Sequence, residues 1–151
     1  MGLQNEERSE RFRNNRHKTV ANILFTYNNV ASRLQKLLNG YKLTLQQYNI
    51  MRILYRYHPE PACNLVIREQ MLDARSDITR IVDRLIKEKL VNREVCHHDR
   101  RKVNIRLTPS GLKLLREMEH INEKMDRIAS GLTEEELLEL SRLLEKVRET
   151  Q

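Results

Sequence analysis

The stretch RSDITRIVDRLIKEKLVNREVCHHDRRKVNIRLTPSG, residues 75–111, decides the fold that this chain is expected to adopt. Its first part has apolar residues at steps of three and four, the period of a helix with one buried face: Ile78, Ile81, Val82, Leu85 and Ile86. After Lys89 the period changes to two, over Val91–Val95 and again over Val103–Leu107, as in half-buried strands. The stretch therefore predicts a helix followed by two antiparallel strands, with a turn at residues 96–101.

Positive charge is concentrated in the same stretch. Ten cationic and five acidic side chains lie between Arg75 and Arg106, in a chain whose formal net charge is +7. Such concentration is expected where Lys and Arg neutralise phosphates and release counterions, although a merely solvated helix face is the alternative. A helix joined to a charged hairpin can contact the major groove and the neighbouring minor groove of a duplex. This is the outline of a winged helix.

The composition suits a soluble, mainly helical protein. The chain has 151 residues, of which 39% are hydrophobic and 32% charged, with four glycines and three prolines. This length allows one domain with helical extensions and a sizeable core. The N-terminus is polar, and no window of about 18 uncharged apolar residues exists. We therefore expect a cytoplasmic protein without a membrane partner.

Helical patterns precede the deciding stretch. A helix is expected over Thr19–Leu38, with Gly40 as its C-terminal cap. Thr44 can cap a second helix that runs to the turn-rich residues 58–61, and a short third helix is expected over Asn64–Leu72. A turn at residues 73–75 then leads to Ser76, the expected N-cap of the next helix. Helix, tight turn and helix is an arrangement that reads DNA.

Two more helical segments follow the hairpin. Thr108 and Pro109 are a typical helix start, and apolar residues keep helical spacing from there to Leu132 over some twenty residues. Thr133 and Glu136 form a capping box for a last helix. The long apolar stripes at both chain ends have little globular core to pack on. Packing across a two-fold axis would bury them, which predicts a helical dimer interface.

Four motifs in this order resemble the MarR family of bacterial transcription regulators. They are T-R-I-V-D-R-L at Thr79–Leu85, L-V-N-R at Leu90–Arg93, D-R-R at Asp99–Arg101 and V-N-I-R-L-T-P-S-G at Val103–Gly111. The resemblance spans roughly residues 18–147. Two positions depart from the family pattern: Lys89 stands where a glycine often precedes the first wing strand, and Asp73 stands at a turn position that tends to be apolar.

The resemblance implies a mainly α fold with a small β-hairpin wing, in one domain over residues 1–151. Helices at about 18–40 and 109–149 would form the dimer interface, and about 44–108 would form the winged helix-turn-helix lobe. The implied function is a sequence-specific, homodimeric regulator, expected to be a repressor of an inverted-repeat operator. The recognition helix, Ser76–Lys89, would enter the major groove, and the wing would follow the minor groove of double-stranded DNA.

The candidate site residues follow from the pattern and the resemblance together. We expect DNA contacts from the N-terminal part of the recognition helix and from the wing: Arg75, Ser76, Asp77, Thr79, Arg80, Arg84, His98, Arg100, Arg101 and Lys102. By resemblance, Asp99 orients Arg101 and so structures the wing. Also by resemblance, a small aromatic ligand that releases the DNA would bind near Tyr27, Tyr48 and Tyr55, although any single one of them is more simply explained as a core tyrosine with its hydroxyl at the surface.

Other functions have weaker support in the sequence. Cys96, His97, His98 and Asp99 have metal-ligating side chains, but adjacent ligands rarely close a tetrahedral site, so neither a metal nor a cofactor is expected. The chain has no nucleophile elbow or phosphate-binding glycine loop, so we expect no enzyme. Cys63 and Cys96 are expected as reduced thiols, with oxidant sensing by Cys96 as an alternative. A non-specific architectural DNA binder and a winged-helix protein-interaction module remain the rival functions.

Overall fold

The computed structural model describes residues 12–73, 75–95 and 103–149. Helices make up most of it: α2 (Asn15–Leu38), α3 (Leu45–Tyr57), α4 (Asn64–Gln70), α5 (Ile78–Lys87), α6 (Pro109–Glu117), α7 (Glu119–Asp126) and α8 (Glu134–Glu149), with 3-10 turns η1 (Asn39–Tyr41) and η2 (Arg127–Ala129). The strands are β1 (Ala62–Cys63), β2 (Val91–Val95) and β3 (Val103–Leu107). The predicted class, mainly α with a small β-hairpin, is confirmed.

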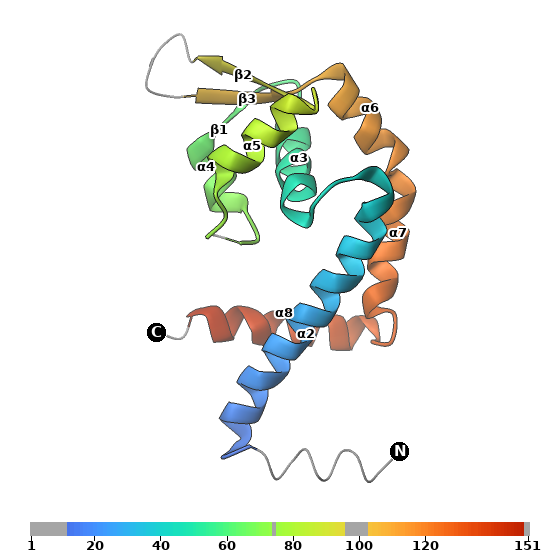
Figure 1. Cartoon of the computed structure of the whole chain (residues 1–151). Coiled ribbons are helices and arrows are strands. Elements are labelled where there is room, and N and C mark those ends of the chain that lie inside the picture. The colour runs from blue at the N-terminus through green and yellow to red at the C-terminus, as the bar shows by residue number, and fades with distance from the viewer. Residues whose placement is uncertain (1–11, 74, 96–102, 150–151) are drawn as a thin grey trace.

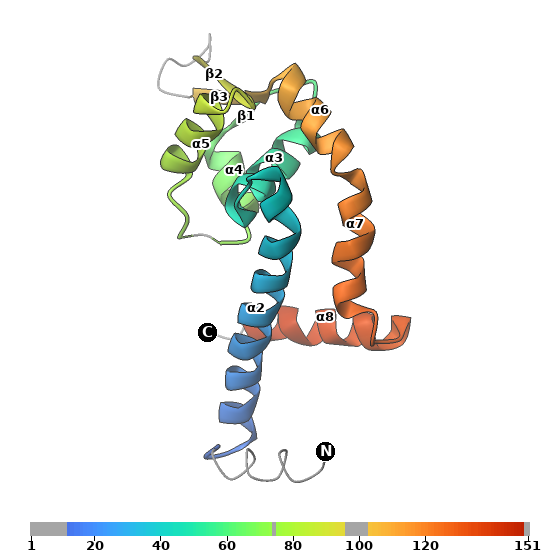
Figure 2. The ribbon, with the colours of Figure 1, turned by 45° about the vertical axis from the view of Figure 1, so that its right-hand side comes forward.

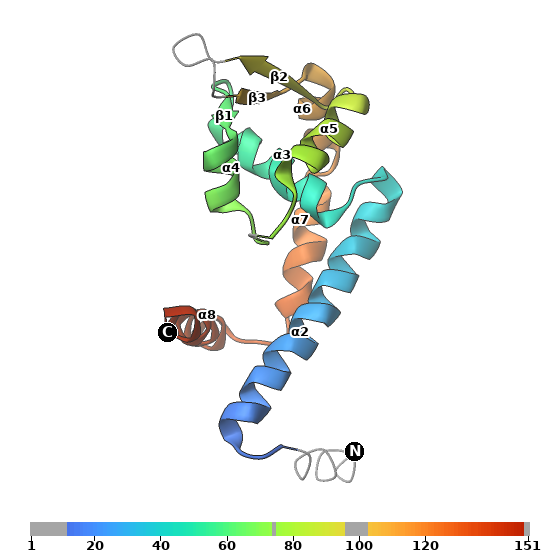
Figure 3. The same ribbon diagram turned by 60° about the vertical axis from the view of Figure 1, so that its left-hand side comes forward.

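The elements form a lobe and an extension (Figure 1). The lobe contains α3, α4, α5 and the sheet, and α6 borders it. Helix α2 runs from the far end of the molecule toward the lobe, α7 runs beside α2 away from the lobe, and α8 turns off at a steep angle beyond α7 (Figures 2 and 3). Helix α5 and strands β2 and β3 therefore lie at one end of the molecule, and the N-terminal end of α2 lies with α8 at the other (Figure 1). Within the described residues, no helix is both long and apolar enough to cross a membrane.

The core of the lobe lies between α3, α5 and the sheet. The strand order is β1-β3-β2, and both pairings are antiparallel, with Val91 opposite Leu107 and Val95 opposite Val103. Fully buried side chains come from each element around it: Ile50, Met51, Ile53, Ile67, Val82, Leu85, Val91 and Ile105. Their spacing along the chain is the helical and alternating pattern that the sequence shows, so the pattern identifies the core.

The end of α2 differs from the prediction. Gly40 was expected as the C-terminal cap, but the cap is Asn39 and Gly40 lies in η1, after which Lys42 takes the left-handed conformation with φ 56°. The side chain of Gln35 explains the difference, because it donates to the carbonyl oxygen of Leu43 and accepts from the N–H of Leu45. These bonds stabilise one more turn beyond α2. The prediction of a Gly40 cap was therefore wrong.

The start of α5 also differs from the prediction. Ser76 was expected as the N-cap, but the helix begins at Ile78 and Asp77 is the cap, with its Oδ1 accepting from the N–H of Arg80 at 3.1 Å. The Oγ of Ser76 is buried without a hydrogen-bond partner among the described residues. Aspartate caps a helix as well as serine does, so sequence alone could not decide between neighbouring residues.

Two further features were not predicted. Strand β1 has only two residues, too few to show alternation, and it pairs with β3 through Ala62 and Ile105. The long helix expected after Pro109 is interrupted at Met118, where the N–H of Ile121 bonds to the Met118 carbonyl oxygen. Both Met118 and Ile121 are buried, so the apolar spacing continues across the break and hides it.

The predicted caps at the other helix starts are confirmed. Thr44 forms a capping box with Gln47 at α3. Thr108 accepts from the N–H of Gly111, and Pro109 is the first residue of α6. Thr133 and Glu136 bond reciprocally before α8. Each of these caps depends on residues at most three apart, which is why the sequence shows them.

Candidate nucleic-acid interface

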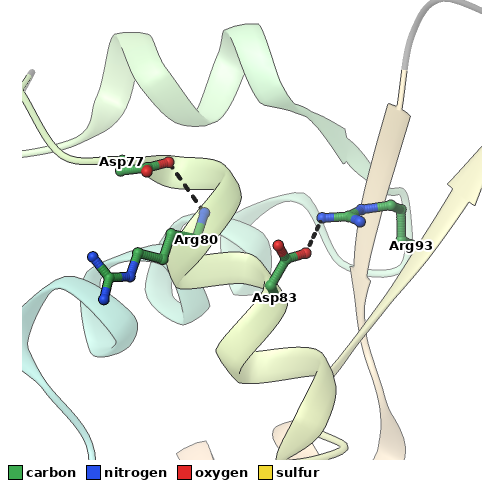
Figure 4. A network of polar contacts seen from close by, with 4 residues as sticks. All are labelled: Asp77, Arg80, Asp83 and Arg93. Carbon is green, nitrogen blue, oxygen red and sulfur yellow. Dashed lines mark hydrogen bonds and ion pairs between the residues drawn. The ribbon is translucent and has the colours of Figure 1, made fainter.

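Helix α5 has one buried and one exposed face. Ile78, Val82 and Leu85 are buried in the lobe, whereas the side chains of Thr79, Arg80 and Arg84 are exposed. In Figure 4 the guanidinium of Arg80 extends away from the three other residues drawn. The exposed face thus carries Thr79 and Arg80 in the N-terminal half of the helix, the part that reaches base edges when such a helix enters a major groove, and Arg84 in its last turn.

The turn before α5 is held by two aspartates. The Oδ1 of Asp73 accepts from the N–H of Arg75 at 3.0 Å, and Asp77 caps the helix. Arg75 itself is exposed. These local bonds order the chain just before α5 and at its start, and the role observed for Asp77 is that of a cap.

An ion pair joins α5 to the first wing strand. The Nη2 of Arg93 on β2 lies 2.6 Å from the Oδ1 of Asp83 on α5, and the two side chains are 38% and 48% exposed. Figure 4 shows Arg93 reaching across from the strand to the helix. An ion pair this exposed adds little stability. Its main effect is to fix the orientation of the wing strand relative to the helix.

A second arginine, Arg106, connects the two wing strands to the segment before β1. The Nε of Arg106 on β3 lies 3.3 Å from the Oε1 of Glu94 on β2, and its Nη1 donates to the carbonyl oxygen of Pro59. Arg106 therefore joins both wing strands to the segment that leads into β1. The sequence could not reveal these pairings of Arg93 and Arg106, because the partners are ten or more residues away.

The turn at the base of the wing has Lys89 where the resemblance led us to expect glycine. Lys89 has φ 60°, the left-handed conformation that a glycine adopts without strain. The N–H groups of Lys89 and Leu90 bond to the carbonyl oxygens of Ile86 and Leu85 at 2.9 and 3.0 Å, which is the Schellman pattern of a helix end. The departure from the family pattern at Lys89 therefore leaves the turn intact.

The tip of the wing lies outside the described residues. This applies to the predicted DNA contacts His98, Arg100, Arg101 and Lys102, to the predicted orienting residue Asp99, and to the metal and redox alternatives at Cys96 and His97. Their roles stay predictions. Cys63, at the end of β1, is a half-buried free thiol.

The structure does not bring the three predicted pocket tyrosines together. Tyr48 is buried, and its hydroxyl donates to the Oδ1 of Asn122 at 3.3 Å. Burial raises the pKa of Tyr48, and the charge of Arg52 opposes this rise. Tyr55 is exposed, with the guanidinium of Arg52 5.8 Å from its ring centroid. Tyr27 lies apart from both, in a groove of about 640 Å³ between α2, α3, residues 71–73 and α8.

The extension exposes much apolar surface. No residue of α8 is buried, and large exposed apolar side chains lie on α2 and α8 or just before α8: Val20, Leu24, Phe25, Tyr27, Leu132, Leu138, Leu140, Leu143 and Val147. Soluble monomers rarely expose so many such residues on two adjoining helices. These helices are the ones that the sequence assigned to a dimer interface.

Comparison with known proteins places this arrangement in a family. The protein-family model described as transcriptional regulator SarA/Rot matches residues 33–118 of this chain. The HTH-type transcriptional regulator PecS of Dickeya dadantii is 32% identical over 120 residues, which are 76% of this chain and 70% of PecS. The crystal structure of a MarR transcription factor from Planctomyces limnophilus is 34% identical, with a TM-score of 0.66 over 85% of this chain and 93% of that chain.

A structure with bound DNA has the same fold. The S. aureus MepR-DNA complex superposes with a TM-score of 0.78 over 87% of this chain and 97% of that chain, at 22% identity. The family-model match, over residues 33–118, includes helix α5 and both wing strands. From its sequence, its fold and these relatives, the chain belongs to the MarR family of winged helix-turn-helix transcriptional regulators.

Proposed function

We propose that the chain is a homodimeric repressor that binds an inverted-repeat operator in double-stranded DNA and is released by a small ligand. The observation that carries this proposal is the exposed face of α5, where Thr79, Arg80 and Arg84 stand beside a wing strand fixed by Arg93. The MepR-DNA complex supports it, because a protein of the same fold binds DNA. An operator on the chromosome would place the protein in the cytoplasm.

The predicted contacts divide into two groups. Arg75, Thr79 and Arg80 reach base edges, because they lie at or near the start of α5. Arg84 and the wing residues His98, Arg100, Arg101 and Lys102 contact phosphates or the minor groove, with Asp99 orienting Arg101. Ser76 and Asp77 shape the turn and the helix start through which α5 meets the DNA.

DNA binding and dimerisation are assigned to different parts of the fold. Residues 44–108 form the DNA-binding lobe, and residues 18–40 and 109–149 form the dimer interface, within one domain over 1–151. The exposed apolar side chains of α2 and α8 support this assignment. A two-fold axis through these helices would place two recognition helices on half-sites about one helical turn apart, roughly 34–36 Å.

Selection from random duplexes tests the proposal. The purified chain is incubated with a random duplex pool at about physiological salt, and the retained DNA is sequenced. We expect a two-fold symmetric motif with fixed half-site spacing. Salt-sensitive retention without enrichment would instead indicate an architectural DNA binder, and no retention would indicate a protein-interaction module. Either result would overturn the proposal.

Arg80→Ala tests the base-reading role within the same assay. We expect it to relax the preference at one position of each half-site, at a cost of about 1–3 kcal/mol for the preferred base. Arg16→Ala is the matched control, because Arg16 is exposed near the start of α2, at the far end of the molecule from α5 (Figure 1), and the change in net charge is the same. A uniform loss of affinity for all duplexes in Arg80→Ala would contradict the role.

A further inference from the structure

A glutamine is buried at the start of α3. Among the described residues, Gln47 is the one polar side chain that the fold buries, with 4% of it exposed. Its Oε1 accepts from the N–H of Thr44 at 2.8 Å and so completes the capping box. Its Nε2 donates to the Oε1 of Glu88 at 3.5 Å, at the end of α5. Because a buried donor without an acceptor destabilises the folded state, Gln47 favours the position of α5 in which Glu88 reaches it.

A second glutamine holds the same part of the chain from α2. The Nε2 of Gln35 donates to the carbonyl oxygen of Leu43 at 2.9 Å, and its Oε1 accepts from the N–H of Leu45 at 3.0 Å. Gln35 and Gln47 therefore hold residues 43–45 from two sides. A series of hydrogen bonds thus leads from α2, through this short connection and Gln47, to the end of α5.

Glu88 stands where the recognition helix passes into the wing. It is the C-cap residue of α5, and the left-handed Lys89 and then Leu90 connect it to β2. Glu88 belongs to none of the ion pairs in the described part of the structure, so its bond to Gln47 does not compete with a cation. The bond therefore holds both the end of the recognition helix and the base of the wing against the connection from α2.

We propose that Gln47 is a positioning residue, which fixes the recognition helix relative to α2 and thereby determines the half-site spacing that the dimer accepts. This inference rests on the proposed function, in which α2 belongs to the dimer interface and α5 reads the DNA. In a dimer, the separation of the two recognition helices depends on how α5 is held relative to α2, and the half-site spacing follows that separation. Loss of the contact with Glu88 leaves the base contacts of each lobe intact and makes other spacings acceptable.

Gln47→Glu separates this role from helix capping. At this position of a capping box, glutamate accepts from the N–H of the N-cap residue as well as glutamine does, and an acidic side chain in the first turn suits the helix dipole. The new carboxylate cannot donate to Glu88, and the two carboxylates repel each other. A residue that only caps α3 should therefore tolerate the change, whereas a positioning residue should not.

Two duplexes provide the measurement, one with the selected operator and one with a single base pair inserted between its half-sites. The ratio of the two affinities is the spacing preference of the purified full chain. We expect this ratio to fall about fivefold in Gln47→Glu, while the base preference within each half-site stays the same. The double variant Gln47→Glu and Glu88→Gln exchanges donor and acceptor, so its ratio should return to within about twofold of the unmodified chain.

Gln46→Glu is the matched control, because Gln46 is the neighbouring residue, is exposed and gives the same change in net charge. Its spacing preference should equal that of the unmodified chain. An unchanged ratio in Gln47→Glu would leave the residue as a cap alone and would overturn the proposal. A loss that Glu88→Gln does not restore would also overturn it, because the effect would not pass through Glu88.

Glu88→Ala removes the acceptor from an exposed position, so this variant does not depend on whether α3 tolerates Gln47→Glu. We expect it to lower the spacing preference to a similar extent. Glu123→Ala, at an exposed position on α7, gives the same change in net charge and should leave the preference unchanged. Equal ratios in Glu88→Ala and Glu123→Ala would overturn the proposal.

Hydrogen exchange without DNA separates this inference from the proposed function. The N–H groups of residues 88–90 bond to carbonyl oxygens of the last turn of α5, so their exchange reports how firmly the helix end is held. We expect about fivefold faster exchange in Gln47→Glu and recovery in the double variant. If the chain selects no operator but the exchange responds in this way, the proposed function fails and the contact stands. If an operator is selected and the spacing preference is unchanged, only the positioning role fails. No operator and unchanged exchange would overturn both.

Discussion

At Gly111 two segments of backbone come into close contact at the base of the wing. A Cβ at this position would lie 2.2 Å from the carbonyl oxygen of Leu90 and 3.1 Å from the Cδ2 of Leu107. The Leu90 oxygen cannot easily move away, because it accepts from the N–H of Thr108 at 3.0 Å. The glycine of the L-T-P-S-G motif is therefore required by the space between α6 and the end of α5.

Gly111→Ala should lower the free energy of unfolding by about 2 kcal/mol, since added atoms in a packed site force the backbone apart. Urea denaturation followed by circular dichroism measures this change. Gly131→Ala is the control, because a Cβ at Gly131 would meet no atom within 4 Å. If the two variants have the same urea midpoint, the close contact with the Leu90 carbonyl oxygen does not explain the glycine at position 111.

Lys89 shows how neighbouring residues can impose a backbone conformation. A left-handed residue with a Cβ costs roughly 1–2 kcal/mol, yet Lys89 adopts it with φ 60°. Two helix-end hydrogen bonds hold the turn, and the hydroxyl of Thr108 donates to the Lys89 carbonyl oxygen at 2.7 Å. The burial of Leu85 and Leu90 adds an apolar contact across the turn. These interactions offset the strain, which is why the usual glycine can be absent.

At the scale of elements, the recognition helix and the wing act together through Asp83 and Arg93. A helix and a strand that contact different grooves can make both contacts at once only if their relative orientation is fixed. Without that, ordering them on the DNA costs free energy of binding. The ion pair is short, at 2.6 Å, but it is partly exposed, so its contribution to stability is small. Its contribution to DNA affinity should be larger than its contribution to folding.

A double-mutant cycle with Asp83→Asn and Arg93→Gln tests this coupling. We expect each variant to lose about fivefold in operator affinity, and the double variant to lose no more, because all three break one interaction. The coupling measured by urea denaturation should stay below about 1 kcal/mol. Lys113→Gln breaks an exposed pair with Glu117 on α6 and should leave operator affinity unchanged. Independent, additive losses in the cycle would show that the pair does not position the wing.

The elements that sequence predicted well are those with local signals. The apolar period indicates α3 and α5, the alternation indicates β2 and β3, and caps within three residues indicate the helix starts at Thr44, Thr108 and Thr133. Strand β1 and the break at Met118 were missed, because one is too short for a pattern and the other preserves the apolar spacing. Strand β1 exists only through its pairing with β3, more than 40 residues later.

The same distinction applies to the candidate site. The exposed face of α5 follows from the helical period, so Thr79, Arg80 and Arg84 could be selected from the sequence. The ion pair between Asp83 and Arg93 connects α5 to β2. The groove is lined by residues of α2 and of α8, which lie more than 100 residues apart in the chain. No local pattern shows such pairings. The tyrosines were grouped because they are close in sequence, and the fold separates them.

At the scale of the whole molecule, the exposed apolar side chains of α2 and α8 form two sets. One set lines the groove, and the other lies outside it, including Leu24 and Leu138, which are 59% and 72% exposed. The first set can be covered by a small ligand. The second set needs a larger partner, and a second copy of the chain provides one with matching apolar helices.

The double variant Leu24→Arg and Leu138→Arg tests the dimer. Both side chains are largely exposed in the single chain, so the substitutions should leave the helical content unchanged while adding charge to the surface that the dimer would bury. Sedimentation velocity should then show a monomer where the unmodified chain sediments as a dimer.

Operator affinity should fall about a hundredfold in this double variant, because the second half-site is no longer bound within one complex. Leu65→Arg is the matched control: Leu65 is 63% exposed on α4, outside the extension, and this variant should still sediment as a dimer. If the double variant remains dimeric, the two chains associate through another surface. The exposed side chains at Leu24 and Leu138 would then need a different partner.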